Sequence, residues 1–325
     1  MSVEQKIRGM FLGAAIGDAL GAAFENTPSA LIEHTLGAPK VSDYHKGIAQ
    51  SLIPGHPAGM PTDDTAMALS LAGALVSGRP ITAASIAKAF LSDFAPDGAY
   101  GRLIWNGGIG GAVARALGRL ERGADPAING QPSDGGNGAV MRAHVVGALP
   151  DREAVLAVAA MQARVTHGHP AAIAAAQAVA LVSHDALSGR PLSAGLPVGV
   201  TDPVLAASWA AMHAELKPLA GLPSNLRDVA MSAWESAAAA HAIAYMFADD
   251  VEGGMASAAA SGGDTDTIAC MVGAMLGTVN GEDALPKRWL KGLRERAAVE
   301  TAADSLIDRY YPSAKRPAAA AAGRS

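Results

Sequence analysis

Apolar runs with helical spacing recur along almost the whole of this 325-residue chain, whereas the alternating pattern of a β-strand is scarce. Alanine-rich tracts at residues 171–176 and 237–240 supply small residues that favour helices and allow them to pack closely. Half of the residues are hydrophobic and only 17% are charged, so the chain has enough apolar surface to bury a large core. We therefore predict an all-α protein that forms a single compact domain.

The predicted helices are separated by loops rich in proline and glycine. The periodicity predicts helices over residues 5–25, 64–76, 83–94, 109–122, 151–163, 170–188, 203–215, 226–247, 251–261, 267–278 and 286–299. Loops at residues 54–61, 131–138 and 261–263 interrupt them, and loops on a rigid scaffold are where functional sites usually lie. We assign residues 1–312 to the domain, with active-site loops at helix N-termini. Residues 313–325 are low in complexity and have nothing to bury, so we expect a disordered tail there.

Charge and cysteine content exclude several classes of function. The net charge is −5 and no dense stripe of lysine or arginine occurs, which leaves no electrostatic footprint for nucleic acid. A single cysteine, Cys270, excludes an intrachain disulfide and any cysteine-rich metal site, and it suits a reducing compartment. We therefore expect a cytoplasmic protein without a nucleic-acid partner.

The N-terminus partly imitates a secretory signal. Lys6 and Arg8 precede the apolar run of residues 9–17, but Asp18 and Glu25 interrupt the continuation. We favour a buried amphipathic helix over a signal peptide at this end of the chain. No uninterrupted apolar run reaches the roughly 18 residues of a membrane-spanning helix, so we expect no membrane span.

Two short acidic clusters carry the clearest chemical signal. One contains Asp63 and Asp64 and the other contains Asp264 and Asp266, each beside threonines at the start of an apolar helical run. Carboxylates this close repel one another unless a cation or a proton neutralises them, and oxygen ligands suit Mg²⁺ or Mn²⁺ better than zinc or copper. Helix capping also places acids at such positions, but one cap needs only one carboxylate. Two copies of a double-acid cluster favour a metal site.

Two further carboxylates, Asp18 and Glu25, are seven residues apart and share a face of the first predicted helix. Glu25 ends that helix beside a loop. A carboxylate at a helix C-terminus is electrostatically unfavourable, which favours a functional role for it. Asp18 lies within an apolar stretch and suits a structural carboxylate whose hydrogen bonds are satisfied.

A glycine-rich loop and two histidines complete the set of candidate site residues. The loop, within residues 133–142, leads into an apolar run, and its amides could cradle a phosphate, although it lacks the lysine of a P-loop. His167 and His169 precede another predicted helix. No third soft ligand accompanies them, so substrate contact or helix capping is favoured over metal ligation.

In their order along the chain, these motifs resemble those of the ADP-ribosylglycohydrolases, a family that includes the dinitrogenase reductase-activating glycohydrolase and the vertebrate ADP-ribosylhydrolases. The resemblance extends over residues 5–282 and runs through residues 9–21, 62–67, 136–138, 141–142, 166–170 and 263–267. It implies an all-helical, orthogonally packed single domain that holds two Mg²⁺ or Mn²⁺ ions. The implied metal ligands are Thr62, Asp63, Asp64, Asp264, Asp266 and Thr267.

The resemblance also implies roles in catalysis and substrate binding. Glu25 would transfer protons or gate the metals, and Asp63 and Asp264 would belong to the catalytic centre. The substrate-binding residues would be Gly136, Asn137, Gly138 and His167, with Trp234 as the candidate to stack on adenine. The usual aromatic stacking residue is missing, because an Asp-Gly pair at residues 134–135 replaces a Ser-Tyr pair.

Two segments bear on which substrate the chain would take. Nitrogenase-regulating members carry a Phe-Asp-Ile-Gly segment whose aspartate recognises arginine, whereas residues 106–110 contain no acid. Residues 96–101 look instead like the segment of members that act on serine-linked ADP-ribose or ADP-ribose polymers. The resemblance therefore implies a metal-dependent hydrolase that cleaves the glycosidic bond at C1″ of ADP-ribose on an ADP-ribosylated protein, through a serine or arginine linkage, or on a related conjugate. The alternatives are a non-catalytic, crystallin-like member of the fold and a module that only binds ADP-ribose.

Overall fold

The computed structural model of the chain describes residues 1–101, 108–214, 216 and 222–312. Within these residues the secondary structure is helical, with isolated β-bridges but no strand, so the prediction of a compact all-α domain is confirmed. The predicted disordered tail, residues 313–325, lies outside the described residues.

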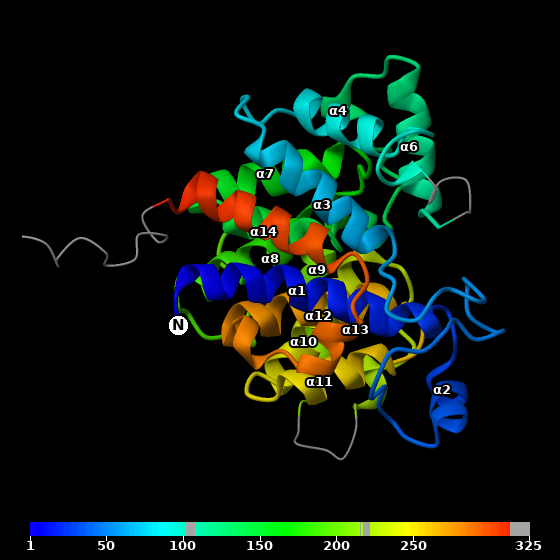
Figure 1. The fold of residues 1–325 in the computed structure, drawn as a ribbon. Helices are drawn as coiled ribbons and strands as arrows, with labels where there is room; N and C mark the ends of the chain where they lie inside the picture. The colour runs from blue at the N-terminus through cyan, green and yellow to red at the C-terminus, as the bar shows by residue number, and fades with distance from the viewer. Residues whose placement is uncertain (102–107, 215, 217–221, 313–325) are drawn as a thin grey trace, which may run out of the picture.

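The helices are joined by connections of very different length, the longer ones between α2 and α3 and between α6 and α7 (Figure 1). Their bounds are α1 Val3–Gly21, α2 Ser29–Leu36, α3 Asp63–Val76, α4 Ala83–Asp93, α6 Gly111–Glu121, α7 Arg152–Arg164, α8 Pro170–Leu187, α9 Pro203–His213, α10 Ala233–Met246, α11 Val251–Ala259, α12 Thr265–Asn280, α13 Lys287–Gly292 and α14 Arg296–Tyr310. Short 3-10 helices at Ala22–Phe24, Asn137–Ala139 and Ala143–Ala148 extend or link them.

The observed helices differ from the predicted ones in several places. Helix α2 was not predicted, since its eight residues between Pro28 and a left-handed Gly37 are too few to show a helical period. The helix predicted over residues 286–299 is divided into α13 and α14 at Glu295, which takes a left-handed conformation with φ of 59°. Helix α14 also continues beyond the predicted end, to Tyr310. The helix predicted from residue 226 begins only at Ala233, after a segment that pairs with the loop ahead of α12.

Helices α1 and α12 form the centre of the domain, and α1 crosses the middle of the molecule with α12 beneath it (Figure 1). Their backbones approach at glycines spaced four residues apart on one face of α1. A Cβ on any of these glycines would overlap backbone of α12, at Gly277, Gly273, Ala269 and Thr265 for Gly9, Gly13, Gly17 and Gly21 respectively. The two helices run antiparallel, so the end of α1 lies beside the start of α12.

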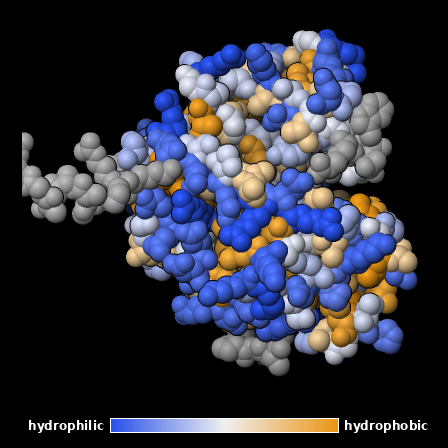
Figure 2. Space-filling view, in the orientation of Figure 1, coloured by the Kyte–Doolittle hydropathy of each residue, from blue (hydrophilic) through white to orange (hydrophobic). Residues whose placement is uncertain are grey.

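The sequence analysis predicts no membrane-spanning helix. By length and composition alone, however, two of the described helices could cross a membrane, namely Val3–Phe24 and Pro170–Leu187. Within the protein, however, 94% and 78% of their apolar windows are buried, as in the core helices of a globular domain. The visible surface of the molecule is mostly hydrophilic, with hydrophobic residues in scattered patches (Figure 2). Within the described residues a membrane span is therefore not indicated.

Candidate active site

The first acidic cluster lies at the N-terminus of α3. Thr62 caps this helix and accepts the N–H of Asp64 at 3.3 Å. Asp18 of α1 accepts the N–H groups of Thr62 and Thr65, each at 3.0 Å, and the Thr65 hydroxyl at 2.5 Å. Capping is thus supplied by Thr62 and Asp18, as predicted for a structural Asp18, and it leaves Asp63 and Asp64 without a capping role.

The second acidic cluster lies at the N-terminus of α12. Asp264 occupies the N-cap position but makes no side-chain cap; it accepts a hydrogen bond from the amide of Asn137 instead. Asp266 follows in the first turn. The carbonyl of Gly263 accepts the N–H of Asn26 at 2.7 Å, which ties this loop to the segment that carries Glu25. Because α1 ends at Gly21, Glu25 follows the helix rather than sharing its face with Asp18.

The two clusters meet in one place. Carboxylate oxygens of Glu25, Asp264 and Asp266 lie within 4.8 Å of one another. The Thr62 hydroxyl, at the start of the other helix, lies 3.4 Å from an oxygen of Asp64 and 3.5 Å from an oxygen of Asp266. One further oxygen of Asp64 and one of Asp266 are buried without any hydrogen-bond partner. Orphaned buried carboxylate oxygens of this kind call for a cation or a proton.

The electrostatics of the cluster agree with that reading. Burial, followed by repulsion from Asp264 and Asp63, raises the pKa of Glu25 to about 8. Burial also raises the pKa of Asp63 to about 7 and holds the pKa values of Asp64 and Asp266 well above their usual range. A hard divalent cation bound by these oxygens would oppose such shifts, and the oxygen-only donor set fits one.

The cluster opens into a cavity of about 920 Å³. Of the residues predicted from the sequence, those that line it are Glu25, Thr62, Asp63, Asp64, Gly136, Asn137, Gly138, His167, Asp264, Asp266 and Thr267. Trp234 is not among the lining residues. Instead its ring lies 4.9 Å from the ring of His169, and a Cβ at position 135 would lie only 3.1 Å from it, so glycine at 135 makes room for Trp234.

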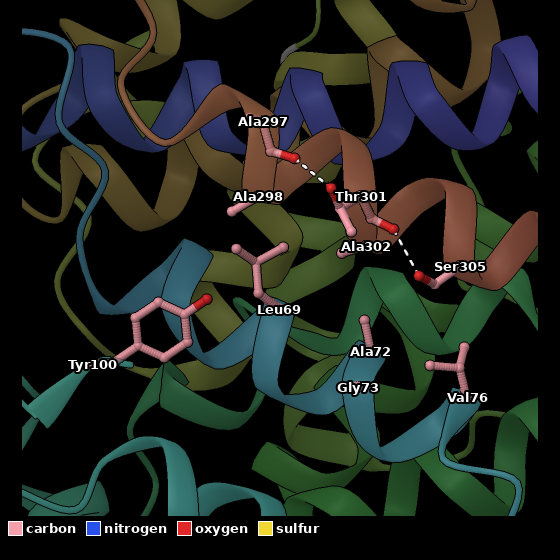
Figure 3. A pocket seen from close by; sticks show the side chains of 10 residues that line it. All are labelled: Leu69, Ala72, Gly73, Val76, Tyr100, Ala297, Ala298, Thr301, Ala302 and Ser305. Carbon is pink, nitrogen blue, oxygen red and sulfur yellow. Dashed lines mark hydrogen bonds between the residues drawn. The ribbon is translucent and has the colours of Figure 1, made fainter. Parts of the chain in front are cut away.

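A second cavity, of about 390 Å³, lies between α3 and α14 and differs in character (Figure 3). Its walls are small apolar side chains from both helices, with Tyr100 at one side. The hydroxyls of Thr301 and Ser305 donate to carbonyls of their own helix at 2.8 Å. None of the predicted site residues lines this cavity.

Comparison with known proteins agrees with the geometry. A family model described as ADP-ribosylglycohydrolase matches residues 1–316. The chain belongs to this family. The ADP-ribosyl-[dinitrogen reductase] glycohydrolase of Rhodospirillum rubrum is 26% identical over 90% of this chain and 91% of that protein. ADP-ribosylhydrolase ARH3 of Gallus gallus is 24% identical over 94% of this chain and 93% of that protein.

Two further comparisons extend the picture within the ADP-ribosylglycohydrolase family. ADP-ribosylarginine hydrolase Tri1 of Pseudomonas putida is 28% identical over 94% of this chain and 78% of that protein. A solved structure described as an ADP-ribosylglycohydrolase-related protein complex matches with a TM-score of 0.69 and 28% identity, over 95% of this chain and 99% of that one. Family membership and these relatives support a glycohydrolase with ADP-ribosylhydrolase activity.

Within this ADP-ribosylglycohydrolase site, Asn137, which was predicted to bind substrate, contacts one of the acids directly. Its side-chain amide donates to Asp264 and to the Ser236 hydroxyl, the latter at 3.0 Å, and its backbone N–H donates to the carbonyl of Met231 at 3.1 Å. Asn137 therefore orients an acid of the second cluster. Whether it also contacts substrate stays a prediction.

Sequence reasoning missed one wall of the cavity, which is the N-terminus of α6. Ile109, Gly110, Gly111, Ala112 and Val113 line it there, and the Gly110 N–H donates to Asp63 at 3.2 Å. The signal available in the sequence was the run of glycines just ahead of an amphipathic helix. Residues 106–110, which contain no acid where nitrogenase-regulating members carry an aspartate, are described only from residue 108 on.

Proposed function

We propose that this ADP-ribosylglycohydrolase uses two Mg²⁺ or Mn²⁺ ions to hydrolyse the glycosidic bond at C1″ of ADP-ribose. The substrate would be an ADP-ribosylated protein, modified on serine or arginine, or a related ADP-ribose conjugate, encountered in the cytoplasm. The observation that carries the proposal is the pair of orphaned carboxylate oxygens on Asp64 and Asp266, buried in an oxygen-only cluster that opens into a cavity of about 920 Å³.

The residues that would hold the ions come from the two helix starts. They are Thr62, Asp63, Asp64, Asp264, Asp266 and Thr267, all of which line the cavity. When bound, the ions would supply Lewis-acid contacts for hydroxyl groups of the ribose. Asp18 and Asn137 keep the ligands in place, since Asp18 fixes the N-terminus of α3 and Asn137 fixes Asp264.

Glu25 would move the proton in this reaction. In hydrolysis a water oxygen forms the new bond to C1″, the bond from C1″ to the serine oxygen or arginine nitrogen breaks, and one proton passes from the water to the leaving atom. The Glu25 carboxylate would take the proton from the water and give it to the leaving atom. Its side chain lines the cavity beside Asp264 and Asp266.

The remaining walls suit a nucleotide-sized ligand. The cavity falls in the size range of pockets that bind small molecules. The loop at Gly136 and Gly138 and the N-terminus of α6 both face it, and backbone amides at helix N-termini favour phosphate oxygens. Gly108, Ile109 and Gly110, which line the cavity where nitrogenase-regulating members carry the aspartate, offer no carboxylate to an arginine side chain. The serine linkage is therefore our first choice.

The proposal is tested by a release assay with arginine-, serine- and phosphate-linked ADP-ribose side by side, in Mg²⁺ and in Mn²⁺. We expect cleavage of at least one protein linkage, with serine fastest. Tight ADP-ribose binding without cleavage of any substrate would establish a binding module instead. Absence of both binding and cleavage would overturn the proposal as a whole.

A further inference from the structure

Arg142 is a fully buried cation in the wall behind the substrate cavity. It forms no salt bridge with any described residue, and its charge is held by oxygen acceptors and by the face of Phe90, 4.8 Å away. Its Nε donates to the Gln162 side chain at 2.7 Å, and one terminal nitrogen donates to the Gly138 carbonyl at 2.7 Å. A buried charge costs several kcal/mol unless its contacts are complete, so such an arrangement implies a specific task.

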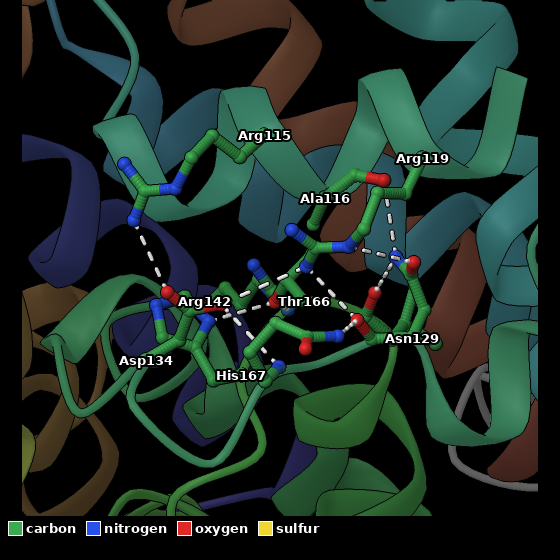
Figure 4. Close-up of polar contacts among 10 residues, drawn as sticks. Arg115, Ala116, Arg119, Asn129, Asp134, Arg142, Thr166 and His167 are labelled. Atoms are coloured by element: carbon green, nitrogen blue, oxygen red, sulfur yellow. Dashed lines mark hydrogen bonds and ion pairs between the residues drawn. The ribbon is translucent and has the colours of Figure 1, made fainter. Parts of the chain in front are cut away.

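The other terminal nitrogen of Arg142 leads to the cavity through Thr166 (Figure 4). It donates to the Thr166 hydroxyl oxygen at 2.7 Å, and that oxygen lies 2.8 Å from Nδ1 of His167. The side chain of His167 is 1% exposed and lines the cavity. Its Nε2 has no hydrogen-bond partner within the part of the chain that the structure describes.

The direction of these two hydrogen bonds is fixed by chemistry. A guanidinium can only donate, so the Thr166 oxygen accepts from Arg142. Among the described residues the Thr166 hydroxyl proton then has one acceptor within reach, Nδ1 of His167, and would otherwise be buried without a partner. Nδ1 therefore carries no proton, and the ring proton of a neutral His167 is on Nε2.

We infer that Arg142, acting through Thr166, fixes His167 as the tautomer that donates its Nε2 N–H into the substrate cavity. This inference rests on the proposed function, and it makes Arg142 and Thr166 positioning residues. The group that His167 meets must be an acceptor oxygen, from the diphosphate or from the distal ribose of ADP-ribose.

Two other features agree with a permanent donor at this position. Burial, with the positive charge of Arg142 as the next cause, lowers the pKa of His167 to about 3, so the ring stays neutral. Arg142 also holds the Gly138 carbonyl, which removes one competing acceptor from the rim of the cavity. Arg142 thus acts on two parts of the cavity wall: it orients the His167 ring through Thr166, and it occupies the Gly138 carbonyl.

The tautomer can be measured on the protein without substrate. Nitrogen NMR of protein labelled with ¹⁵N-histidine distinguishes a protonated ring nitrogen from an unprotonated one, and His167→Gln assigns the signal among the nine histidines. We expect a neutral His167 with Nε2 protonated in the wild type and in Thr166→Ser, which keeps the hydroxyl. Thr166→Val should give a mixture of tautomers. Protonation at Nδ1 in the wild type would overturn the inference.

Binding provides the second readout, with ADP-ribose and ADP as probes in the presence of Mg²⁺. In an even mixture of tautomers only half of the Thr166→Val protein carries the donor form, so ADP-ribose binding should weaken about twofold, while Thr166→Ser binds like the wild type. A loss for both probes would place the acceptor on the diphosphate, and a loss for ADP-ribose alone would place it on the distal ribose.

Thr278→Val is the matched control for removal of a buried hydroxyl. The Thr278 hydroxyl donates only to the Ala274 carbonyl within α12, so this variant should keep both wild-type affinity and the His167 signal. Thr166→Val with unchanged tautomer and unchanged affinity would overturn the inference. If the wild type neither binds nor cleaves ADP-ribose while its His167 spectrum is as expected, the proposed function fails and the relay from Arg142 stands.

Discussion

The close approach of α1 and α12 can be tested with one added methyl group. In Gly17→Ala the new Cβ would overlap the carbonyl oxygen of Ala269 and lie 2.9 Å from the backbone nitrogen of Cys270. Both obstacles are helix backbone, which cannot move aside as a flexible side chain does. The two helices must therefore separate, and with them the parts of the site that each one carries.

The size of the effect follows from two opposing contributions. Replacing glycine by alanine inside a helix gains about 1 kcal/mol, because the unfolded chain loses freedom and the helical propensity rises. Overpacking costs about 1–3 kcal/mol, and we take about 3 kcal/mol because the contact is with backbone. The expected net loss of unfolding free energy is about 2 kcal/mol, which corresponds to a fall in Tm of about 3 °C for a protein of this size.

Urea unfolding and thermal scans of Gly17→Ala measure this loss, and Gly73→Ala is the control. Gly73 lies on the exposed face of α3, where a Cβ would meet nothing within 4 Å, so alanine there should stabilise the protein by about 0.5–1 kcal/mol. ADP-ribose release should fall in Gly17→Ala and not in Gly73→Ala. Stability of Gly17→Ala equal to or above the wild type would refute the reasoning about the α1–α12 contact.

Three further predictions concern the site and the core. Glu25→Gln keeps the side-chain shape but cannot exchange a proton, so turnover should fall roughly 10²–10⁴-fold while calorimetry still shows ADP-ribose binding; wild-type turnover would assign proton transfer to another group. Asp266→Asn should abolish the Mg²⁺-dependent rise in Tm, which for the wild type reflects about 2.7 kcal/mol when Mg²⁺ exceeds its Kd 100-fold; an unchanged rise would exclude Asp266 as a ligand. Burial lowers the pKa of His144 from 6.5 to about 4, so the unfolded chain takes up a proton in this range that the folded chain does not. The stability advantage of the wild type over His144→Gln in urea unfolding should shrink as the pH falls from 6.5 to 4, and a constant difference would contradict the neutral, buried state of His144.

Much of the helical fold could be predicted because apolar periodicity is a local property of the sequence. The predictions failed where a short-range exception decided the structure: α2 has only eight residues, and Glu295 breaks a continuous apolar pattern by taking a left-handed conformation. The sequence analysis treats the glycines at every fourth position of α1 only as part of an apolar run. This spacing lets the backbone of α1 approach that of α12, where small residues far along the chain lie opposite the glycines.

The acids of the site could be predicted because each cluster contains more carboxylates than a helix cap needs. What the sequence could not show is that Thr62 and Asp18 already satisfy the N-terminus of α3, which leaves Asp63 and Asp64 for another task. The stacking partner of Trp234 depends on the space that Gly135 leaves, and the wall formed by α6 depends on tertiary packing. Neither feature can be predicted from a local sequence pattern.

The central claim is that the two acidic clusters form one divalent-cation site that hydrolysis requires. The most direct test follows release of ADP-ribose from the linkage cleaved fastest, by protein stripped with EDTA and then returned to rising free Mg²⁺ or Mn²⁺. The account predicts no release in EDTA and full recovery with either ion, with Asp64→Asn failing to recover. Undiminished release in EDTA, by protein freed of divalent metal, would contradict it.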